Sequence, residues 1–409
     1  MAWRPAAQER EGLREFSLAV ISWGVLRVAL LKCVGLGWGS DVARYAWFAR
    51  SWAAGGTPYR AFPVEYPPGA MPVFLVPWLA GGDARYARSF AVEMMACDLA
   101  VLLWVVATAR RLSPASPRRS AVPIAAYLVS TELLFPVLYA RFDLAATVFA
   151  VLALHLVLSG RFAAGALVLG LGGGVKVWPL LLAPLVTLFT ARERGPKPAA
   201  RVLGLVALGS VALALPFLPA AGGRVFAFVG FHSGRGIQLE STWATLALLL
   251  GDAGAIRVAF DHTFGAIHLS GRAAAAFAAA SGPAVLVLAL TPLLLAARRG
   301  FGERGEEKAR RVTATAAATI TGALLGAKVL SPQFLLWAVP LWAVSLGGAA
   351  VAAAPLSCAL TAAVYPWLWP ALLGPGPGHA LAVAALASRN LLLVAIYVVL
   401  LRRISRSGG

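Results

Sequence analysis

Charge is scarce in this sequence, because Asp, Glu, Lys and Arg make up only 13% of its 409 residues while 60% are hydrophobic. Soluble domains carry about a quarter charged residues, so we exclude water as the main solvent of this chain. The three cysteines lie inside apolar segments without paired spacing, which argues against a disulfide framework or a zinc site. No Asp-x-Asp pair occurs, and the glycines before Lys176 lack the G-x-x-x-x-G-K-[ST] order. Neither a metal-clamped nucleotide sugar nor a nucleoside triphosphate site is therefore predicted.

Long apolar runs are abundant instead. A hydrocarbon core about 30 Å thick needs roughly 20 apolar residues per helix. Backbone groups cannot face lipid unpaired, and the sequence has no alternating strands of a barrel, so the spans should be helical. We therefore predict an all-α polytopic membrane protein, a single domain over residues 1–409 with about 10–12 transmembrane helices. The predicted spans are near 16–37, 87–108, 121–140, 144–159, 202–220, 274–297, 312–329, 334–350, 356–373 and 381–401.

Positive charge gives the expected orientation. The net charge is +19, and the Lys and Arg residues lie in short clusters between apolar runs, which favours a topology signal over a nucleic-acid-binding face. Because such clusters mark the cytoplasmic side, we expect the tail 1–15 and the C-terminus in the cytoplasm. The clusters are Arg4/Arg10/Arg14, Arg110/Arg111/Arg118/Arg119, Arg192/Arg194/Lys197/Arg201, Arg298/Arg299/Arg304/Lys308/Arg310/Arg311 and Arg402/Arg403/Arg406.

Two segments do not fit simple spans. Residues 162–190 should start and end on the inner side, and glycines 172–174 followed by Lys176 and Pro179 predict two short or re-entrant halves that meet near the outer side. Residues 67–80 are too short to span easily and contain several prolines. We expect them to be re-entrant or to lie along the outer surface.

With this topology, the polar segments all fall on the outer face. Groups that are distant in sequence but meet on one face of a helical bundle are what a single active site requires. The segments are the first outer loop 38–86, residues 141–143, Lys176, the large outer loop 221–273 and residues 328–333.

Asp41 follows the first span and opens a segment of helical character. Asp is a preferred N-cap residue, and a carboxylate at the membrane boundary can also accept a proton from a hydroxyl. The same loop continues through Tyr59 to Glu65 and Tyr66 with many Pro and Gly residues, which predicts a fixed backbone shape. Its aromatic residues are also typical of an interfacial anchor.

Lys176 lies among Gly and Val at membrane depth, where a charge is costly unless it pairs or lines a wet cavity, so we predict a functional role. Arg141 and Asp143 lie where one span ends and the next begins, and they indicate either a capped turn with its own ion pair or part of a site. Charged residues placed within spans leave pairing inside the bundle and catalysis both open. Examples are Glu93, Asp98, Glu132 and Arg389.

The large outer loop is densely polar between His232 and Trp243. Solvated loops are often polar, so this composition fits either a binding site or an ordinary loop. Lys328 and Gln333 lie between two apolar runs, and Lys328 also fits a snorkelling residue at the interface.

Together these stretches resemble glycosyltransferase family 87 of the GT-C superfamily, the polyprenyl-phosphate-mannose-dependent alpha-mannosyltransferases of bacterial envelopes. The resemblance covers residues 38–350 approximately and rests on the order and spacing of the elements rather than on any one of them. The matching elements are Ser40-Asp41 with Tyr45, Gly56-Thr57-Pro58-Tyr59, Glu65-Tyr66-Pro67-Pro68, Arg141-Phe142-Asp143, Lys176 with Pro179, Arg235-Gly236 through Glu240-Ser241, and Ser331-Pro332-Gln333 ahead of Leu336-Trp337.

The resemblance implies a GT-C-type bundle with re-entrant segments in the bacterial plasma membrane, an outward-facing site, a polyprenyl-phosphate sugar donor and a catalytic Asp41. A single base predicts inversion, with Glu65 or Asp143 as orienting neighbours, and the outer-face cations would stabilise the leaving phosphate. This scheme needs no cofactor and no metal. The expected partners are the lipid-linked donor, a glycolipid or glycan acceptor and membrane lipids, without nucleic acid. The candidate substrate-binding residues are Tyr45, Tyr59, Glu65, Tyr66, Arg141, Asp143, Lys176, His232, Arg235, Gln238, Glu240, Lys328 and Gln333.

The main alternative is a transporter or flippase of lipid-linked saccharides, since broken helices and buried charges also serve transport. A transporter should show paired repeats and a site near the midplane, whereas the candidate groups here favour one face. A non-catalytic scaffold would leave Lys176 and the polar residues 235–240 without a role. The sugar, mannose or another such as arabinofuranose, stays open because hydrogen-bond geometry decides it. The acceptor, a glycolipid, a lipoglycan or a protein, stays open as well.

Overall fold

The computed structural model describes residues 6–34, 41–114 and 116–406. Residues 38–40, which include Ser40 and begin the expected first outer loop, lie outside the described residues. Residues 1–5 of the expected tail also lie outside them. The described chain is mostly helical, at 79%. Four of its helices are long and apolar enough to cross a membrane by length and composition: α3 (Ala70–Leu112), α13 (Arg272–Arg299), the stretch Gly348–Leu368 and α17 (His379–Ser405).

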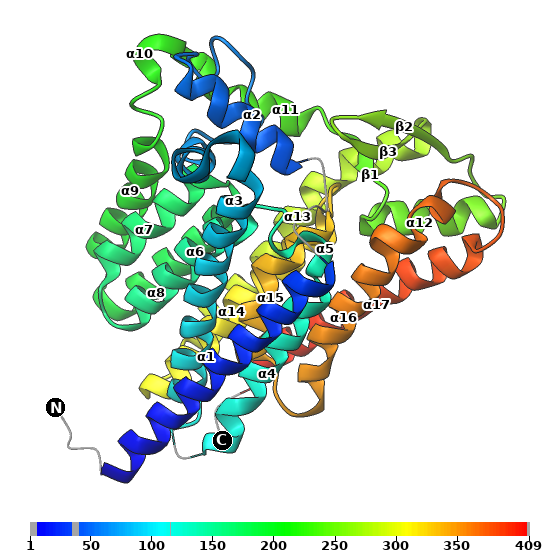
Figure 1. Cartoon of the computed structure of the whole chain (residues 1–409). Helices are drawn as coiled ribbons and strands as arrows, with labels where there is room; N and C mark the ends of the chain where they lie inside the picture. The colour runs from blue at the N-terminus through cyan, green and yellow to red at the C-terminus, as the bar shows by residue number, and fades with distance from the viewer. Residues whose placement is uncertain (1–5, 35–40, 115, 407–409) are drawn as a thin grey trace.

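The other helices, and the short helices within Gly348–Leu368, are as follows. In the N-terminal half they are α1 (Ala6–Val34), α2 (Asp41–Ala53), α4 (Pro117–Leu133), α5 (Phe135–Leu138), α6 (Asp143–Leu158), α7 (Phe162–Val175), η1 (Trp178–Leu182), α8 (Ala183–Arg194) and α9 (Pro196–Ala212). In the C-terminal half they are α10 (Leu218–Ala221), η2 (Gly222–Phe226), α11 (Ala227–Ser233), α12 (Thr242–Asp252), α14 (Gly305–Gly326), η3 (Pro332–Phe334), α15 (Leu335–Ser345), η4 (Gly348–Ala352), α16 (Ala353–Ala362), η5 (Ala363–Leu368) and η6 (Pro370–Leu373). In Figure 1 both ends of the described chain lie at the lower end of the view, whereas α2, α10 and α11 lie at the upper end.

Helix α3 consists of two limbs that meet at Gly82. This glycine has φ 57° and ψ −166°, values outside the helical region that a residue without Cβ adopts at little cost. The first limb lies beside α2 at the upper end of the molecule, and the second limb descends through the bundle (Figure 1). The expected short segment 67–80 thus ends just before the break. Its position relative to a bilayer remains a prediction.

The segment 162–190 is also divided, and the division lies at Lys176, whose backbone is extended between α7 and η1. The glycines before it belong to α7 instead of interrupting it. A Cβ added to Gly172 would lie 2.6 Å from Cβ of Phe149, and one added to Gly173 would overlap Leu180. The glycines therefore allow close packing around the end of α7, and the extended residue ends the helix.

The large loop expected at 221–273 is an ordered structure rather than an open connection. It holds α11, α12 and a three-stranded antiparallel sheet in the order β1-β3-β2, an addition to the all-helical expectation. The strands are β1 (Ile237–Gln238), β2 (Ala259–Thr263) and β3 (Ala266–Ser270). Phe264 and Gly265 join β2 to β3 with φ values of 53° and 68°, the left-handed backbone that a two-residue hairpin turn requires.

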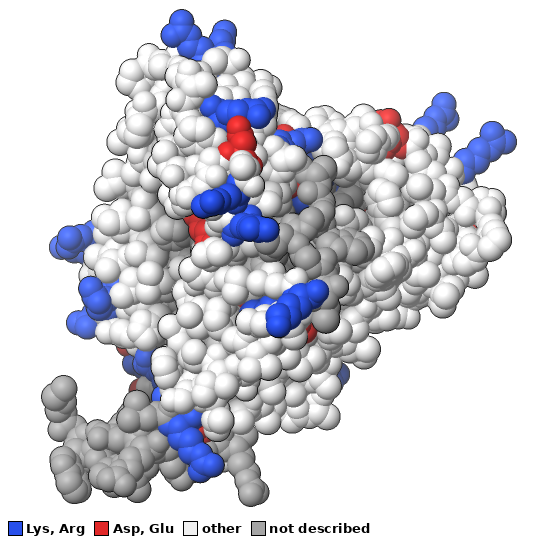
Figure 2. All heavy atoms as spheres, in the orientation of Figure 1, with Lys and Arg blue, Asp and Glu red and all other residues white. Residues whose placement is uncertain are grey.

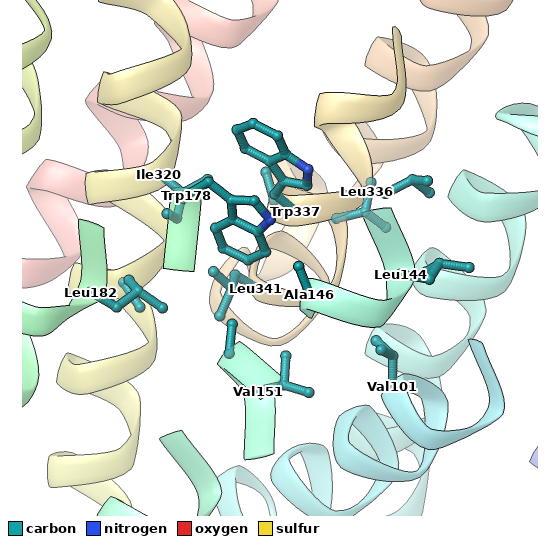
Figure 3. Packing of buried hydrophobic residues seen from close by; sticks show 14 of the residues in the cluster. Val101, Leu144, Ala146, Val151, Trp178, Leu182, Ile320, Leu336, Trp337 and Leu341 are labelled. Atoms are coloured by element: carbon teal, nitrogen blue, oxygen red, sulfur yellow. The ribbon is translucent and has the colours of Figure 1, made fainter. Parts of the chain in front are cut away.

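Apolar side chains form both the interior and much of the surface. Figure 3 shows the inner cluster, where Trp178 of η1 and Trp337 of α15 lie among aliphatic side chains from α3, α6, α14 and α15. On the outside, α1, α9, α13 and α17 carry exposed aliphatic side chains, as a lipid-facing surface would. Figure 2 shows large areas without charge, with charged side chains in separate groups at the upper end, in the middle and along the edges of this face.

One group of charges is sealed inside the bundle. Arg27 of α1 and Asp98 of α3 are both fully buried, and their Nε and Oδ2 atoms are 2.7 Å apart. The Asp98 carboxylate also accepts hydrogen bonds from the Trp23 indole and from the hydroxyls of Tyr127 and Tyr139. Arg27 additionally donates to Glu132 and Thr131. These bonds join α1 to α3, α4 and the segment after α5.

Candidate active site

A cavity of about 1260 Å³ lies where α2, the loop before α3, the start of α6, the α7–η1 junction, the β2–β3 hairpin and α13 meet. All the candidate residues predicted from the sequence line it except Tyr59 and Asp143. The structure thus brings together side chains from residues 38–86, from residues 221–273 and from the breaks between helices. Its walls are charged and aromatic on one side and largely apolar on the other.

Asp41 begins α2 and lies at the cavity wall, where its Oδ2 atom is 2.9 Å from Nη1 of Arg141. The Asp41 side chain keeps 26% of its surface exposed and Arg141 keeps 13%. Asp41 is therefore an accessible base candidate that Arg141 holds in place from the turn before α6.

Asp143, at the start of α6, is fully buried beneath the cavity and binds two groups through Oδ1. Lys176 Nζ lies 2.7 Å from this oxygen, and the indole N–H of Trp337 donates to it over 2.6 Å. The ammonium also lies 4.4 Å from the ring centroid of Phe142, a cation–π distance. Lys176 thus has the counter-ion that a buried ammonium group requires. Asp143 therefore positions Lys176, and it does not position Asp41.

Glu65 was expected to orient Asp41, but it binds Arg44 instead. Arg44 Nη1 lies 2.8 and 2.9 Å from the two carboxylate oxygens of Glu65. Arg44 was missed from the sequence, although its position three residues after Asp41 on a helix puts both on one face. The pair joins α2 to the loop before α3 at the edge of the cavity.

Arg235 and Lys328 are cations on the cavity wall that form no salt bridge with a carboxylate in the described part of the chain. Nε of Arg235 is buried and has no hydrogen-bond partner, while Lys328 donates to the Ser233 carbonyl over 2.7 Å. Partial burial and the nearby cations Arg235 and Lys176 lower the pKa of His232 to about 4, so its ring is neutral at pH 7. The site therefore has unpaired positive charge available for an anion.

The predicted tyrosines build one wall. Tyr45 stacks on Phe74 with ring centroids 4.4 Å apart, and Tyr66 packs edge-on against Phe142 at 4.8 Å. Tyr59 lies behind this wall and donates its hydroxyl to the Tyr66 carbonyl over 2.9 Å. The prediction that Tyr59 binds substrate directly does not fit this position, because its side chain is used to support the loop.

Gln238, Gln333 and Glu240 complete the polar lining. The Gln238 side chain exchanges hydrogen bonds with the Ser331 hydroxyl, and its backbone N–H donates to the Lys328 carbonyl, so β1 is tied to the segment before η3. Glu240 is only 2% exposed, and its Oε1 atom has no hydrogen-bond partner. Burial raises the pKa of Glu240 to about 7.

Aromatic and apolar residues of the cavity were largely missed from the sequence. Trp178 and Trp337 stack with centroids 5.1 Å apart beside Lys176 (Figure 3). Beyond Lys176 the lining turns apolar between η1, α13 and α14. This apolar arm is formed by Val177, Leu181, Pro283, Val285, Leu286, Ala323 and Leu324. Leu286 and Val177 are also exposed on the outside of the molecule, so the arm reaches the apolar surface.

Metal ligands do not gather here: the described residues contain no group of three or more His, Cys, Asp or Glu that could hold a metal ion. No protein-family model and no curated protein matches the chain.

Proposed function

We propose that the protein is an integral membrane hexosyltransferase of the GT-C type, similar to glycosyltransferase family 87. It would move a sugar, mannose in the first instance, from a polyprenyl phosphate to an envelope glycolipid or glycan. The observation that carries the proposal is the cavity itself, which places an accessible Asp41 carboxylate near Lys176, Arg235 and Lys328 and continues into an apolar arm.

The donor fits this arrangement in three parts. Its phosphate is an anion, and Lys176, Arg235 and Lys328 supply fixed positive charge. Its polyprenyl chain is apolar and matches the arm between η1 and α13, which reaches the surface at Leu286. Its sugar would occupy the central space between these cations and Asp41.

The reaction would be a single displacement at the anomeric carbon. Asp41 accepts the proton of the acceptor hydroxyl while that oxygen bonds to the anomeric carbon. The bond from this carbon to the phosphate oxygen breaks, and polyprenyl phosphate leaves with the electron pair. The cations stabilise the negative charge that grows on the leaving phosphate. Attack from the side opposite the phosphate inverts the anomeric configuration.

The test is sugar transfer by purified protein in nanodiscs, with synthetic polyprenyl-phosphate-mannose and octyl α-mannopyranoside as acceptor. We expect the Asp41→Asn variant to lose roughly 10²–10⁴-fold in kcat, the range that general bases contribute. Asp83→Asn is the matched control, because Asp83 is an exposed carboxylate paired with Arg50 at 3.6 Å and does not line the cavity.

Wild-type rates in the Asp41→Asn variant would refute Asp41 as the base. Movement of the intact lipid-linked sugar between leaflets without transfer would favour the transporter alternative instead. Melting curves of both variants separate a chemical loss from a folding defect.

A further inference from the structure

A second wall of the cavity comes from the C-terminal part of the chain, outside the stretch that carries the family resemblance. Tyr365 of η5 and Trp369, which follows it, both line the cavity. Their ring centroids are 6.4 Å apart and their planes lie at 88° to each other, so the two rings form a corner. Tyr365 has an extended backbone, with φ −116° and ψ 119°, inside an otherwise helical segment.

This corner lies on the same side of the cavity as the base candidate. Tyr365 neighbours Arg141, and Arg141 is the residue that pairs with Asp41. The apolar arm is built from η1, α13 and α14. A ligand lying in the corner would therefore have its groups near Arg141 and Asp41.

Glu240 supplies an unsatisfied polar group to the same cavity. Its side chain is 2% exposed, and Oε1 has no hydrogen-bond partner. The Arg389 guanidinium below it donates to the Glu240 carbonyl, which leaves the carboxyl group unbound by that arginine. A buried oxygen without a partner has an unfavourable free energy. A hydroxylated ligand removes this cost, whereas a hydrocarbon chain does not.

We propose that Tyr365, Trp369 and Glu240 form the subsite for the acceptor sugar, an inference that rests on the proposed glycosyl transfer. A hexose has an apolar ring face that packs on an aromatic ring and hydroxyls that donate to a carboxylate. The acceptor class is therefore a saccharide whose terminal ring lies in this corner, with its reacting hydroxyl toward Asp41. A lipid headgroup without sugar or a protein hydroxyl would leave Glu240 without a donor.

Binding of octyl α-mannopyranoside to nanodisc-embedded protein, measured by calorimetry without donor, tests the subsite directly. We expect Trp369→Ala to weaken this binding by roughly tenfold or more, as truncation of an aromatic contact residue does. Trp369→Phe keeps an aromatic ring and should retain most of the affinity for the mannoside. Glu240→Gln should weaken mannoside binding, as Trp369→Ala does. Trp367→Ala is the matched control, since Trp367 is 65% exposed, lies two residues away and does not line the cavity.

Transfer kinetics give the second readout. We expect Trp369→Ala to raise KM for the mannoside far more than KM for the donor. An equal rise in both, an equal effect of Trp367→Ala, or absence of mannoside binding by the wild type would overturn the subsite. Mannoside binding that depends on Trp369 without transfer from any polyprenyl-phosphate sugar would instead overturn the proposed function and leave the saccharide subsite standing.

Discussion

In the described part of the chain, two groups of buried charge differ in how completely their polar atoms are hydrogen-bonded. In the sealed cluster, Arg27 and Asp98 are fully buried, and the described partners occupy both carboxylate oxygens and all three guanidinium nitrogens. In the cavity, buried polar atoms of Arg141, Arg235 and Glu240 have no partner in the described structure. Both groups combine arginine with a carboxylic acid side chain, but the hydrogen bonding is complete in the first group and incomplete in the second.

We interpret the first group as structural and propose that the second group binds a ligand. A buried pair with every hydrogen bond made is stable only as a whole, and it offers nothing to a ligand. Unpaired buried groups cost stability in the free protein, and a ligand that pairs them recovers that cost. Loss of a sealed residue should therefore affect mainly folding, and loss of a cavity residue mainly binding.

The largest effect is expected from Arg27→Met, which leaves the buried Asp98 carboxylate without its counter-ion. We expect the free energy of unfolding to fall by about 3–5 kcal/mol, as when one partner of a buried pair is removed. Chemical denaturation in detergent measures it. Combining Arg27→Met with Asp98→Asn should recover part of the loss. If Arg27→Met alone is as stable as the wild type, the sealed cluster does not have the structural role assigned to it.

The next effect is expected from Arg235→Gln in the cavity. Removing this cation should weaken binding of the polyprenyl-phosphate sugar by roughly 10- to 100-fold, equivalent to one charged hydrogen bond. Because Arg235 Nε has no partner, stability should stay the same or rise. Donor affinity and melting temperature, measured on the same sample, check the predicted loss of binding and the predicted stability. A large fall in melting temperature with unchanged donor affinity would place Arg235 with the structural charges.

The smallest effect concerns pH and Glu240. Burial raises the pKa of this carboxyl from 4.5 to about 7, so the folded state holds the proton more tightly than the unfolded state. Stability from this group is therefore lost as pH rises from 4.5 to 7 and does not return above 7. Glu240→Gln should be more stable than the wild type by ~1–3 kcal/mol at alkaline pH and equal to it near pH 4.5. Identical pH profiles for the two proteins would contradict a buried, unsatisfied carboxyl.

The sequence predicted which segments meet but not which side chains pair. Apolar length and charge clusters were enough to predict that the outer segments converge, and the cavity contains Asp41, Arg141 and Lys176 as expected. Glu65 or Asp143 was expected to orient Asp41, yet Glu65 binds Arg44 and Asp143 binds Lys176. Partner choice depends on helix rotation and loop path, which periodicity does not determine.

The sequence contains a signal for the buried position of Arg27 that was not used, and it contains none for the position of Tyr365 in the cavity. Arg27 is one of two charges inside the first predicted span, with Lys32, and the cost of an unpaired charge in lipid, applied to Lys176, also indicates a buried partner for Arg27. Tyr365 lay inside the predicted span 356–373, where an aromatic residue is typical of any membrane interface. Only the extended backbone within η5, visible in the folded chain, distinguishes it.

The apolar arm determines which donor concentration controls the reaction rate. Because it reaches the outer apolar surface at Val177 and Leu286, a lipid-linked ligand would approach sideways from the bilayer instead of from bulk water. The quantity that governs occupancy is then the mole fraction of donor among the lipids. Diluting the donor with inert lipid at constant bulk concentration should slow turnover, whereas diluting the whole suspension of vesicles with buffer should leave turnover per protein nearly constant.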